Sequence, residues 1–136
     1  MSDFHVHSFD APRERPAPSV LRGRSLSGDD LILELSELTL IVAIKLNCDG
    51  CRDFVHGDLH DLADVNVVVV SATRGDAEWD NARRTIVVAP DLFDELDIRS
   101  APFYVLIDPT SSRVIYEGVI FGPAQVASEI ASFLTS

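Results

Sequence analysis

The sequence predicts an α/β fold, in which helices flank a central mixed sheet. Two strongly apolar runs, residues 39–46 and 65–70, are typical of strands buried on both faces of a sheet. The segments after them space their apolar residues as amphipathic helices do. A length of 136 residues with 46% hydrophobic content is enough for one core. We therefore expect one domain over residues 19–136, preceded by a flexible arm, residues 1–18.

The N-terminal part divides into an arm and a hairpin. Residues 1–18 are polar and rich in proline, which is typical of a mobile or extended lead-in. Short apolar pieces then lie on both sides of a Ser-Gly-Asp-Asp cluster at residues 27–30. This pattern predicts a β-hairpin over residues 20–35.

The first strand and helix of the main sheet follow the hairpin. Residues 39–46 are continuously apolar until Lys45, so we expect a central strand. From Gly50 to about residue 63 the apolar spacing becomes helical, which predicts one helix. One face of it holds Cys51, Val55, Leu59, Leu62 and Ala63, and another holds Arg52, His56 and His60.

Two more strands and two more helices are expected in the middle of the chain. Residues 65–70 predict a second buried strand, and residues 85–89 a third, shorter one. Between them, residues 75–84 predict a short helix that carries Trp79. A further helix should begin after the third strand, with Asp91 as its N-cap.

The C-terminal part predicts a hairpin followed by a helix. Residues 103–107 and 113–121 are expected as paired strands, joined by a turn at residues 108–112. Residues 124–134 predict the terminal helix. Its apolar side comprises Val126, Ala127, Ile130, Ala131, Phe133 and Leu134.

Cys48 and Cys51, the only cysteines, stand between the first buried strand and the following helix. A disulfide between two cysteines this near in sequence would close a very short loop, so it would contribute little to the stability of the fold. The pair therefore indicates redox chemistry or metal binding. A helix N-terminus lowers the pKa of a thiol there, because unpaired N–H groups and the helix dipole favour the thiolate. The placement favours thiol–disulfide exchange.

The net charge of −11, from 22 acidic and 11 basic residues, argues against binding to nucleic acid or anionic membranes. The N-terminal residues show no positive segment followed by an apolar one, so we expect a cytoplasmic protein. In that compartment a C-x-x-C pair is more often catalytic or metal-binding than structural.

Metal binding is the weaker of these two interpretations. His56 and His60 would share a helix face near the cysteines, which is compatible with zinc or copper. Histidines on a polar helix face are more often ordinary surface residues, however. We expect neither a metal nor an organic cofactor.

Three stretches resemble the thioredoxin-like superfamily. Residues 44–52 match its strand–C-x-x-C–helix element, residues 96–107 its segment with a cis-proline before a strand, and residues 114–122 its closing hairpin. The N-terminal hairpin and the strand–helix insertion at residues 85–96 resemble the redoxin branch, which contains TlpA-like and MauD-like proteins. Peroxidase chemistry is not expected, since Ile41 and Lys45 replace the proline and threonine of the peroxiredoxin motif.

The resemblance implies a role for each site residue. Cys48 would attack a protein or small-molecule disulfide, and Cys51 would resolve the mixed disulfide with electrons from a thiol donor. Pro102 would be cis, and the backbone of Ala101 would pair with an extended substrate segment.

Residues beside the cysteines are expected to modulate the chemistry. Asp49 and Gly50 stand between them, and the Asp49 carboxylate should raise the pKa of Cys48, which favours a reductase. Lys45 would stabilise the thiolate, or else simply extend into water.

Two positions depart from the thioredoxin pattern. Asn47 replaces the tryptophan before the first cysteine, and Val42 replaces the buried carboxylate that helps to deprotonate the second. These departures keep open an alternative function, a non-catalytic binding or adaptor module or a redox sensor on the same scaffold.

Overall fold

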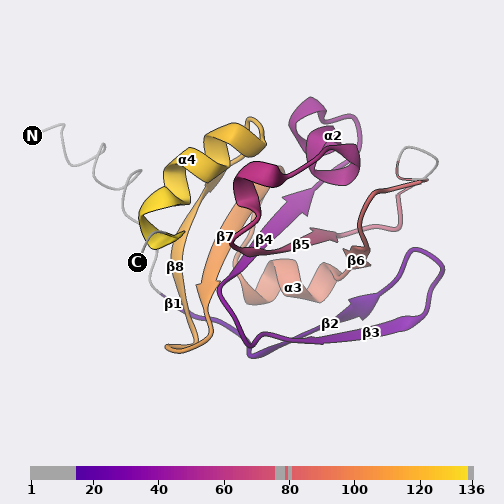
Figure 1. The fold of residues 1–136 in the computed structure, drawn as a ribbon. Coiled ribbons are helices and arrows are strands. Elements are labelled where there is room, and N and C mark those ends of the chain that lie inside the picture. The colour runs from indigo at the N-terminus through magenta and orange to yellow at the C-terminus, as the bar shows by residue number, and fades with distance from the viewer. Residues whose placement is uncertain (1–14, 76–78, 80, 135–136) are drawn as a thin grey trace, which may run out of the picture.

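A computed structural model describes residues 15–75, 79 and 81–134. These residues form one eight-stranded mixed sheet with helices on both faces, in the strand order β1-β8-β7-β4-β5-β6-β2-β3 (Figure 1). The strands are β1 (Arg15–Pro16), β2 (Val20–Arg24), β3 (Asp30–Glu34), β4 (Thr39–Ile44), β5 (Asn66–Ser71), β6 (Ile86–Val88), β7 (Phe103–Asp108) and β8 (Arg113–Val119). The helices are α2 (Asp49–His56), the 3₁₀ helix η1 (His60–Leu62), α3 (Pro90–Glu95) and α4 (Pro123–Leu134).

Strand β4 lies at the centre of the sheet and is buried at all of its positions. It pairs in parallel with β5 and antiparallel with β7, where Ala43 lies opposite Phe103. Alternate β4 side chains enter two separate cores, Leu40 and Val42 on one face and Ile41 on the other. The continuous apolar run predicted this strand correctly, because a strand covered on both faces needs apolar residues at every position.

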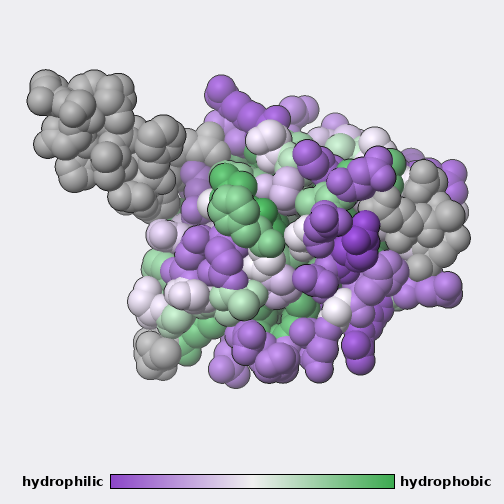
Figure 2. Space-filling model, turned by 90° about the horizontal axis from the view of Figure 1, so that it is seen from above, coloured by the Kyte–Doolittle hydropathy of each residue, from purple (hydrophilic) through white to green (hydrophobic). Residues whose placement is uncertain are grey.

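Helices α2 and α4 cover one face of the sheet, and α3 covers the other (Figure 1). Leu92 and Leu96 from the α3 region pack with Leu21 of the hairpin in one core. Phe54 of α2 and Ile130 of α4 belong to the other core. Seen from the α2/α4 side, hydrophilic side chains cover most of the surface, and hydrophobic side chains are exposed toward its middle (Figure 2).

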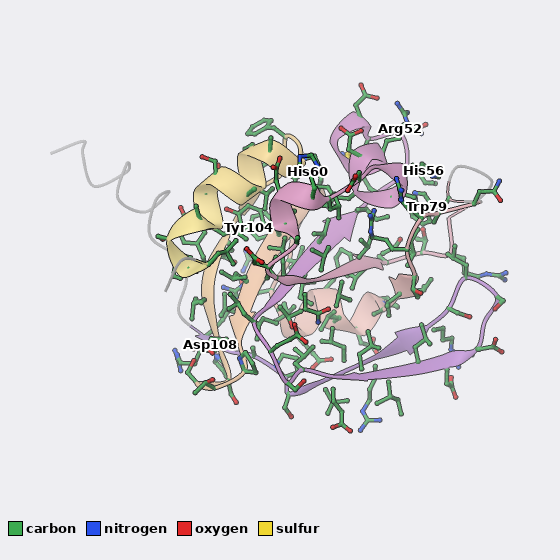
Figure 3. All side chains as sticks on the ribbon, in the orientation of Figure 1. Arg52, His56, His60, Trp79, Tyr104 and Asp108 are labelled. Atoms are coloured by element: carbon green, nitrogen blue, oxygen red, sulfur yellow. A yellow bond between two sulfur atoms is a disulfide. The ribbon has the colours of Figure 1, made fainter. Side chains whose placement is uncertain are left out.

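The helix expected over residues 50–63 is wrong as a single element. Helix α2 ends at His56, and the N–H of Gly57 closes it by donating to the carbonyl of Asp53 at 2.9 Å. The later apolar residues belong to the separate η1 turn, where Leu62 is buried. His56 and His60 therefore lie on two different elements and share no helix face (Figure 3).

Two details of the other helices also differ from expectation. Asp91 is not the N-cap of α3: Ala89 holds that position, because Pro90 already occupies the first helical turn, where proline is well tolerated. In α4 the buried residues are Val126 and Ile130, whereas Ala131 is exposed rather than part of the apolar side.

The N-terminal boundary lies earlier than expected. Residues 15–16, which the sequence places in the flexible arm, form β1 and pair with Val114 and Arg113 of β8. Residues 1–14, the rest of that arm, lie outside the described residues. The short helix expected over residues 75–84 also lies partly outside them, and the described stretch 81–84 contains only turns and bends. The predicted hairpin is confirmed, with Gly23 opposite Leu31 in its β2–β3 ladder.

Candidate functional site

The loop between β4 and α2 delivers Cys48 to the start of the helix. Asn47 adopts a left-handed backbone conformation, with φ 56°, that turns the chain toward α2. Asparagine tolerates this region better than most other side chains, which accounts for a residue other than tryptophan here. Cys48 is the N-cap of α2, and its sulfur accepts a hydrogen bond from the Cys51 N–H at 3.2 Å.

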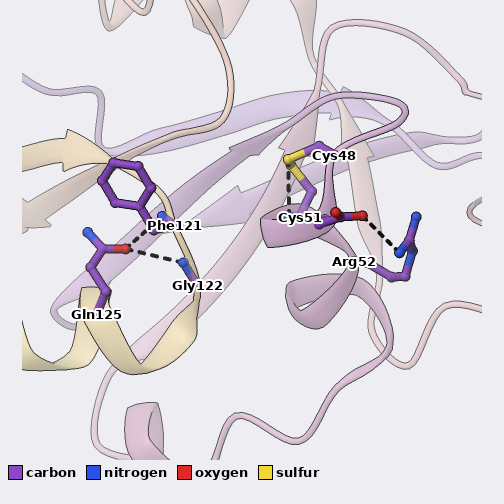
Figure 4. The surroundings of a disulfide bond; sticks show 7 residues. Cys48, Cys51, Arg52, Phe121, Gly122 and Gln125 are labelled. Carbon is purple, nitrogen blue, oxygen red and sulfur yellow. Dashed lines mark hydrogen bonds and ion pairs between the residues drawn. A yellow bond between two sulfur atoms is a disulfide. The ribbon is translucent and has the colours of Figure 1, made fainter.

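Cys48 and Cys51 form a disulfide whose Cα atoms are 5.2 Å apart (Figure 4). The two sulfurs differ in access, since Cys48 is 8% exposed and Cys51 only 1%. Both cysteines belong to the core that includes Phe54 and Val42. The pair therefore closes one edge of the core, with Cys48 the more accessible sulfur.

The charge between the cysteines is partly compensated. The Asp49 carboxylate, expected to act on Cys48, accepts a hydrogen bond from Nη1 of Arg52 at 3.0 Å (Figure 4). Both side chains are well exposed, so water also screens this charge. The charge that was expected to act on Cys48 is therefore offset by Arg52 and by water.

Gly50 brings α2 against the loop that precedes α4. A Cβ atom at Gly50 would lie 3.2 Å from the carbonyl oxygen of Phe121 and 3.7 Å from Cγ2 of Ile120. The absence of a side chain allows this close approach. Phe121 itself is 79% exposed, which leaves a large apolar side chain on the surface beside the cysteine-bearing helix.

Gln125 holds the same loop in place, a role that the sequence pattern did not reveal. Its Oε1 accepts hydrogen bonds from the N–H groups of Phe121 and Gly122 at 2.8 and 3.3 Å (Figure 4). Its Nε2 donates to the carbonyl of Val119 at 2.9 Å. A glutamine in the first turn of a helix that begins with proline was the available signal, because it can serve as a local cap.

The segment before β7 lies alongside the cysteine loop. The peptide bond between Ala101 and Pro102 is cis, the isomer that the resemblance implied. Ala43 lies opposite Phe103, so continuing this antiparallel register places Ala101 beside Lys45. The carbonyl of Pro102 accepts a hydrogen bond from Ile120 N–H at 3.4 Å. Three sequence-distant segments thus adjoin one another: residues 45–51, which hold the disulfide, 101–102 and 120–122.

Lys45 is exposed, and together with Ala101 it lines a cavity of about 380 Å³. This cavity lies at the C-terminal ends of β4 and β5, the edge where ligands bind in many open α/β sheets.

Arg84 holds the far end of α2, and the sequence offered no sign of this. Its guanidinium donates to the carbonyls of Phe54 and, at 2.9 Å, Gly57. These are carbonyls that the end of a helix leaves without partners. Burial, with the neighbouring charge of Arg83 as a second cause, lowers the pKa of Arg84.

The position of the missing carboxylate holds an apolar side chain. Val42 is fully buried and lies opposite Tyr104 in the β4–β7 ladder. The Tyr104 hydroxyl donates to Oε1 of Glu129 on α4 at 2.5 Å. Burial and this hydrogen bond raise the pKa of Tyr104 well above its usual range.

Two features of the described residues bear on the expected function classes. None of the described helices combines the length and apolar character that crossing a bilayer requires. Within the same residues, no group of three or more His, Cys, Asp or Glu side chains is placed to hold a metal ion. The weaker, metal-binding interpretation required His56 and His60 on one helix face, and the structure places them on two elements.

Comparison with known proteins identifies the fold. No protein-family model and no curated protein matches the sequence. Among solved structures, the thioredoxin domain of a thiol-disulfide oxidoreductase from Bacteroides vulgatus is similar, with TM-score 0.65 and 17% identity over 89% of this chain and 96% of that one. A putative thiol:disulfide interchange protein DsbE from Chlorobium tepidum has TM-score 0.65 and 20% identity over 91% and 99% of the chains.

StoA from Bacillus subtilis is also similar, with TM-score 0.61 and 16% identity over 85% of this chain and 98% of that one. At such low identities the similarity establishes the fold, and the predicted thioredoxin-like architecture is confirmed. The chemistry has to be argued from the residues of this chain.

Proposed function

We propose that the protein is a thiol–disulfide oxidoreductase that uses Cys48 and Cys51 as its redox pair. The observation that carries the proposal is the position of Cys48 as the N-cap of α2, with the Cys51 N–H directed at its sulfur. A thiolate at this position gains a charge-assisted hydrogen bond and the favourable end of the helix dipole. The solved structures with similar folds, described as thiol–disulfide oxidoreductases or interchange proteins, support the same chemistry.

The reaction begins with both cysteines reduced. The Cys48 thiolate attacks one sulfur of the substrate disulfide, forming a mixed disulfide and releasing the other substrate sulfur as a thiolate, which takes up a proton. Cys51, after losing its proton, attacks the Cys48 sulfur and releases the second substrate thiol. Two electrons have then passed to the substrate, and the protein holds the Cys48–Cys51 disulfide. A thiol donor restores the reduced pair by the reverse steps.

The segments around the disulfide suit an extended substrate. Ala101 lies beside Lys45 in the continued β4–β7 register, next to the cysteine loop, and would pair through its backbone with the substrate chain. Phe121 offers an exposed apolar side chain on the other flank, next to Gly50. Exposed apolar surface of this kind favours contact with a protein or peptide.

We propose a reductase as the physiological direction and the cytoplasm as the location. Asp49 beside Cys48 opposes the thiolate, which is the opposite of the arrangement in strongly oxidising pairs. The ion pair with Arg52 reduces this effect without removing it, because both side chains are exposed to water.

The test is a comparison of two single-cysteine variants with the wild type. Cys51→Ser should trap a mixed disulfide with a model substrate such as insulin. The product is detectable as a covalent adduct that dithiothreitol cleaves by reducing the disulfide. Cys48→Ser should form none, because Cys51 is almost inaccessible. Wild-type protein should reduce insulin catalytically with dithiothreitol as donor. Adduct formation only by Cys48→Ser would reverse the assigned roles.

A second function is favoured by one observation, the apolar side chain of Val42 at the position where a carboxylate would help to deprotonate Cys51. Without a proton acceptor there, deprotonation of Cys51 would be slow, and the protein would serve as a binding module or redox sensor. In that case Cys51→Ser would still trap an adduct slowly, but the wild type would not turn over insulin above the rate of dithiothreitol alone.

A further inference from the structure

The cavity beside Ala101 is lined by positive charge on a protein whose net charge is negative. We call it the basic pocket. It opens between the loop after β4, the end of β5 and the segment before Pro102. Its lining includes Lys45, Leu46, Thr73, Phe93, Arg99 and Ala101.

The basic pocket concentrates positive charge on an acidic molecule. Lys45 and Arg99 both line it, while none of the described residues lining it is acidic. Lys45 is the only lysine of a chain whose net charge is −11. Arg99 donates from Nε to Asp97 at 3.0 Å, but its side chain is 82% exposed, so its other guanidinium N–H groups remain open to a ligand.

The apolar part of the pocket lies next to these charges. Leu46 and Phe93 are both half-buried and line it beside Lys45. Such a site accepts a side chain with a short aliphatic stem and a negative end, because the stem covers apolar surface and the end meets the two cations. Glutamate has this form.

The position of the pocket relates it to the substrate. Ala101 belongs to its lining and lies, by the β4–β7 register, beside Lys45. In the proposed function the substrate backbone pairs with Ala101. Successive side chains of an extended segment point to opposite sides, so one next to the reacting cysteine would reach the pocket.

We propose that the basic pocket selects peptide disulfides that carry a glutamate or aspartate next to the reacting cysteine. This inference rests on the proposed function and adds a substrate class to it. Exposed ion pairs contribute modestly, about 0.2 to 1 kcal/mol, which corresponds to a preference of up to about fivefold. The pocket sets a preference among disulfides and takes no part in the electron transfer.

The experiment compares three synthetic peptide disulfides that differ only at the residue beside the cysteine, with Glu, Gln or Lys there. Pre-reduced protein is mixed with each peptide, the reaction is quenched with acid, and the second-order rate constant is obtained from the peptide thiols formed. The Glu peptide should react about three to five times faster than the Gln peptide, and the Lys peptide more slowly than either. Raising the salt concentration to about 0.5 M should compress these differences.

Three variants locate the preference. Lys45→Met and Arg99→Met should each lower the ratio of the Glu rate to the Gln rate toward one. The double variant with Lys45→Glu and Arg99→Glu should favour the Lys peptide. Arg22→Met removes the same charge from an exposed position on β2, outside the pocket, and should leave the ratio unchanged.

The outcomes separate the two proposals. Equal rates for the three peptides with an active wild type would overturn the basic pocket and leave the oxidoreductase intact. A Lys45→Met variant that lowers all three rates by one factor would also overturn it, since Lys45 would then act on the thiols. Failure of the wild type to reduce any peptide would overturn the proposed function, and the inference with it.

Discussion

At the residue scale, the two cysteines have unequal surroundings within one short motif. Cys48 accepts the hydrogen bond from the Cys51 N–H and has the more exposed sulfur, whereas Cys51 lies within α2 and is buried. A hydrogen bond to the charged form of a group favours that form, so the geometry makes Cys48 the better thiolate. This inequality supports the order of attack in the proposed mechanism.

Tyr104 gives a prediction about alkaline stability. Its hydroxyl is hydrogen-bonded to Glu129, and burial, then this bond, raises its pKa far above the unfolded value of about 10. Above pH 10 the unfolded chain loses this proton while the folded protein keeps it, so stability must fall as pH rises. We expect the free energy of unfolding to decrease by up to about 1.4 kcal/mol per pH unit above pH 10 from this group.

The measurement is urea unfolding between pH 9 and 11 for the wild type and Tyr104→Phe. The variant should lose most of this slope. Tyr116→Phe is the matched control, because it removes the other tyrosine, which lies nearby at a ring-centroid distance of 6.3 Å. If Tyr104→Phe kept the full wild-type slope, the buried hydroxyl would not be its source.

Single residues also show where prediction from sequence stops. Cys48 and Cys51 could be singled out because their spacing and their place between a strand and a helix identify them, and Pro102 because the segment around it resembles the thioredoxin-like one. Arg84 could not, because it acts through hydrogen bonds to backbone atoms of another segment. Such partners depend on the tertiary structure, and no local pattern encodes them. Gln125 bonds backbone atoms only a few residues away, so its place in the first turn of α4 was a local signal that the prediction missed.

At the scale of elements, helix α2 is held at both ends. Cys48 caps its start, and Arg84 donates to the carbonyls of Phe54 and Gly57 at its end. The predicted helix was too long because apolar spacing continues past Gly57 into η1, where a 3₁₀ turn buries Leu62. Helical spacing reports which side chains are buried, and it does not show where the backbone hydrogen bonds change partner.

Arg84→Met should therefore destabilise the protein and loosen α2. We expect a loss of about 1 to 2 kcal/mol in the free energy of unfolding, because charged hydrogen bonds to the helix end are removed. Amide hydrogen exchange in the last turn of α2 should accelerate. Both quantities can be measured on the oxidised protein.

The neighbouring Arg83→Met is the control for this change. The Arg83 side chain is exposed, and the contact of this residue with α2 is made by its backbone N–H to the carbonyl of Val55 at 2.8 Å. The free energy of unfolding of Arg83→Met should stay within about 0.5 kcal/mol of the wild-type value. Equal effects of both substitutions would show that net charge, rather than the cap, is responsible.

At the scale of the whole molecule, the mixed sheet and its layers were predictable, and the edge strand was not. Buried runs at residues 39–46 and 65–70 indicate the sheet centre directly. Strand β1 is only Arg15–Pro16 and has no apolar pattern. It is held instead by Arg15, which bonds Glu117 of β8 at 2.6 Å and the carbonyl of Leu96 at 2.7 Å.

Arg15→Met tests whether this N-terminal segment belongs to the folded domain. The substitution removes hydrogen bonds that join β1, β8 and the end of α3, so we expect the free energy of unfolding to fall by about 2 kcal/mol. Arg22→Met, an exposed arginine on β2, should change it little. If the free energy of unfolding of Arg15→Met equalled that of the wild type, residues 15–18 would be a loosely attached arm and not part of the folded domain.

The central claim, that Cys48 and Cys51 form a working redox pair, is tested most directly by their reduction potential. Protein equilibrated in glutathione or dithiothreitol buffers is trapped with an alkylating reagent, and the dithiol and disulfide forms are counted by mass. We expect one two-electron transition near the thioredoxin value of about −270 mV. A pair that forms no disulfide across the range would contradict the redox function, and a potential well above about −180 mV would contradict the reductase direction.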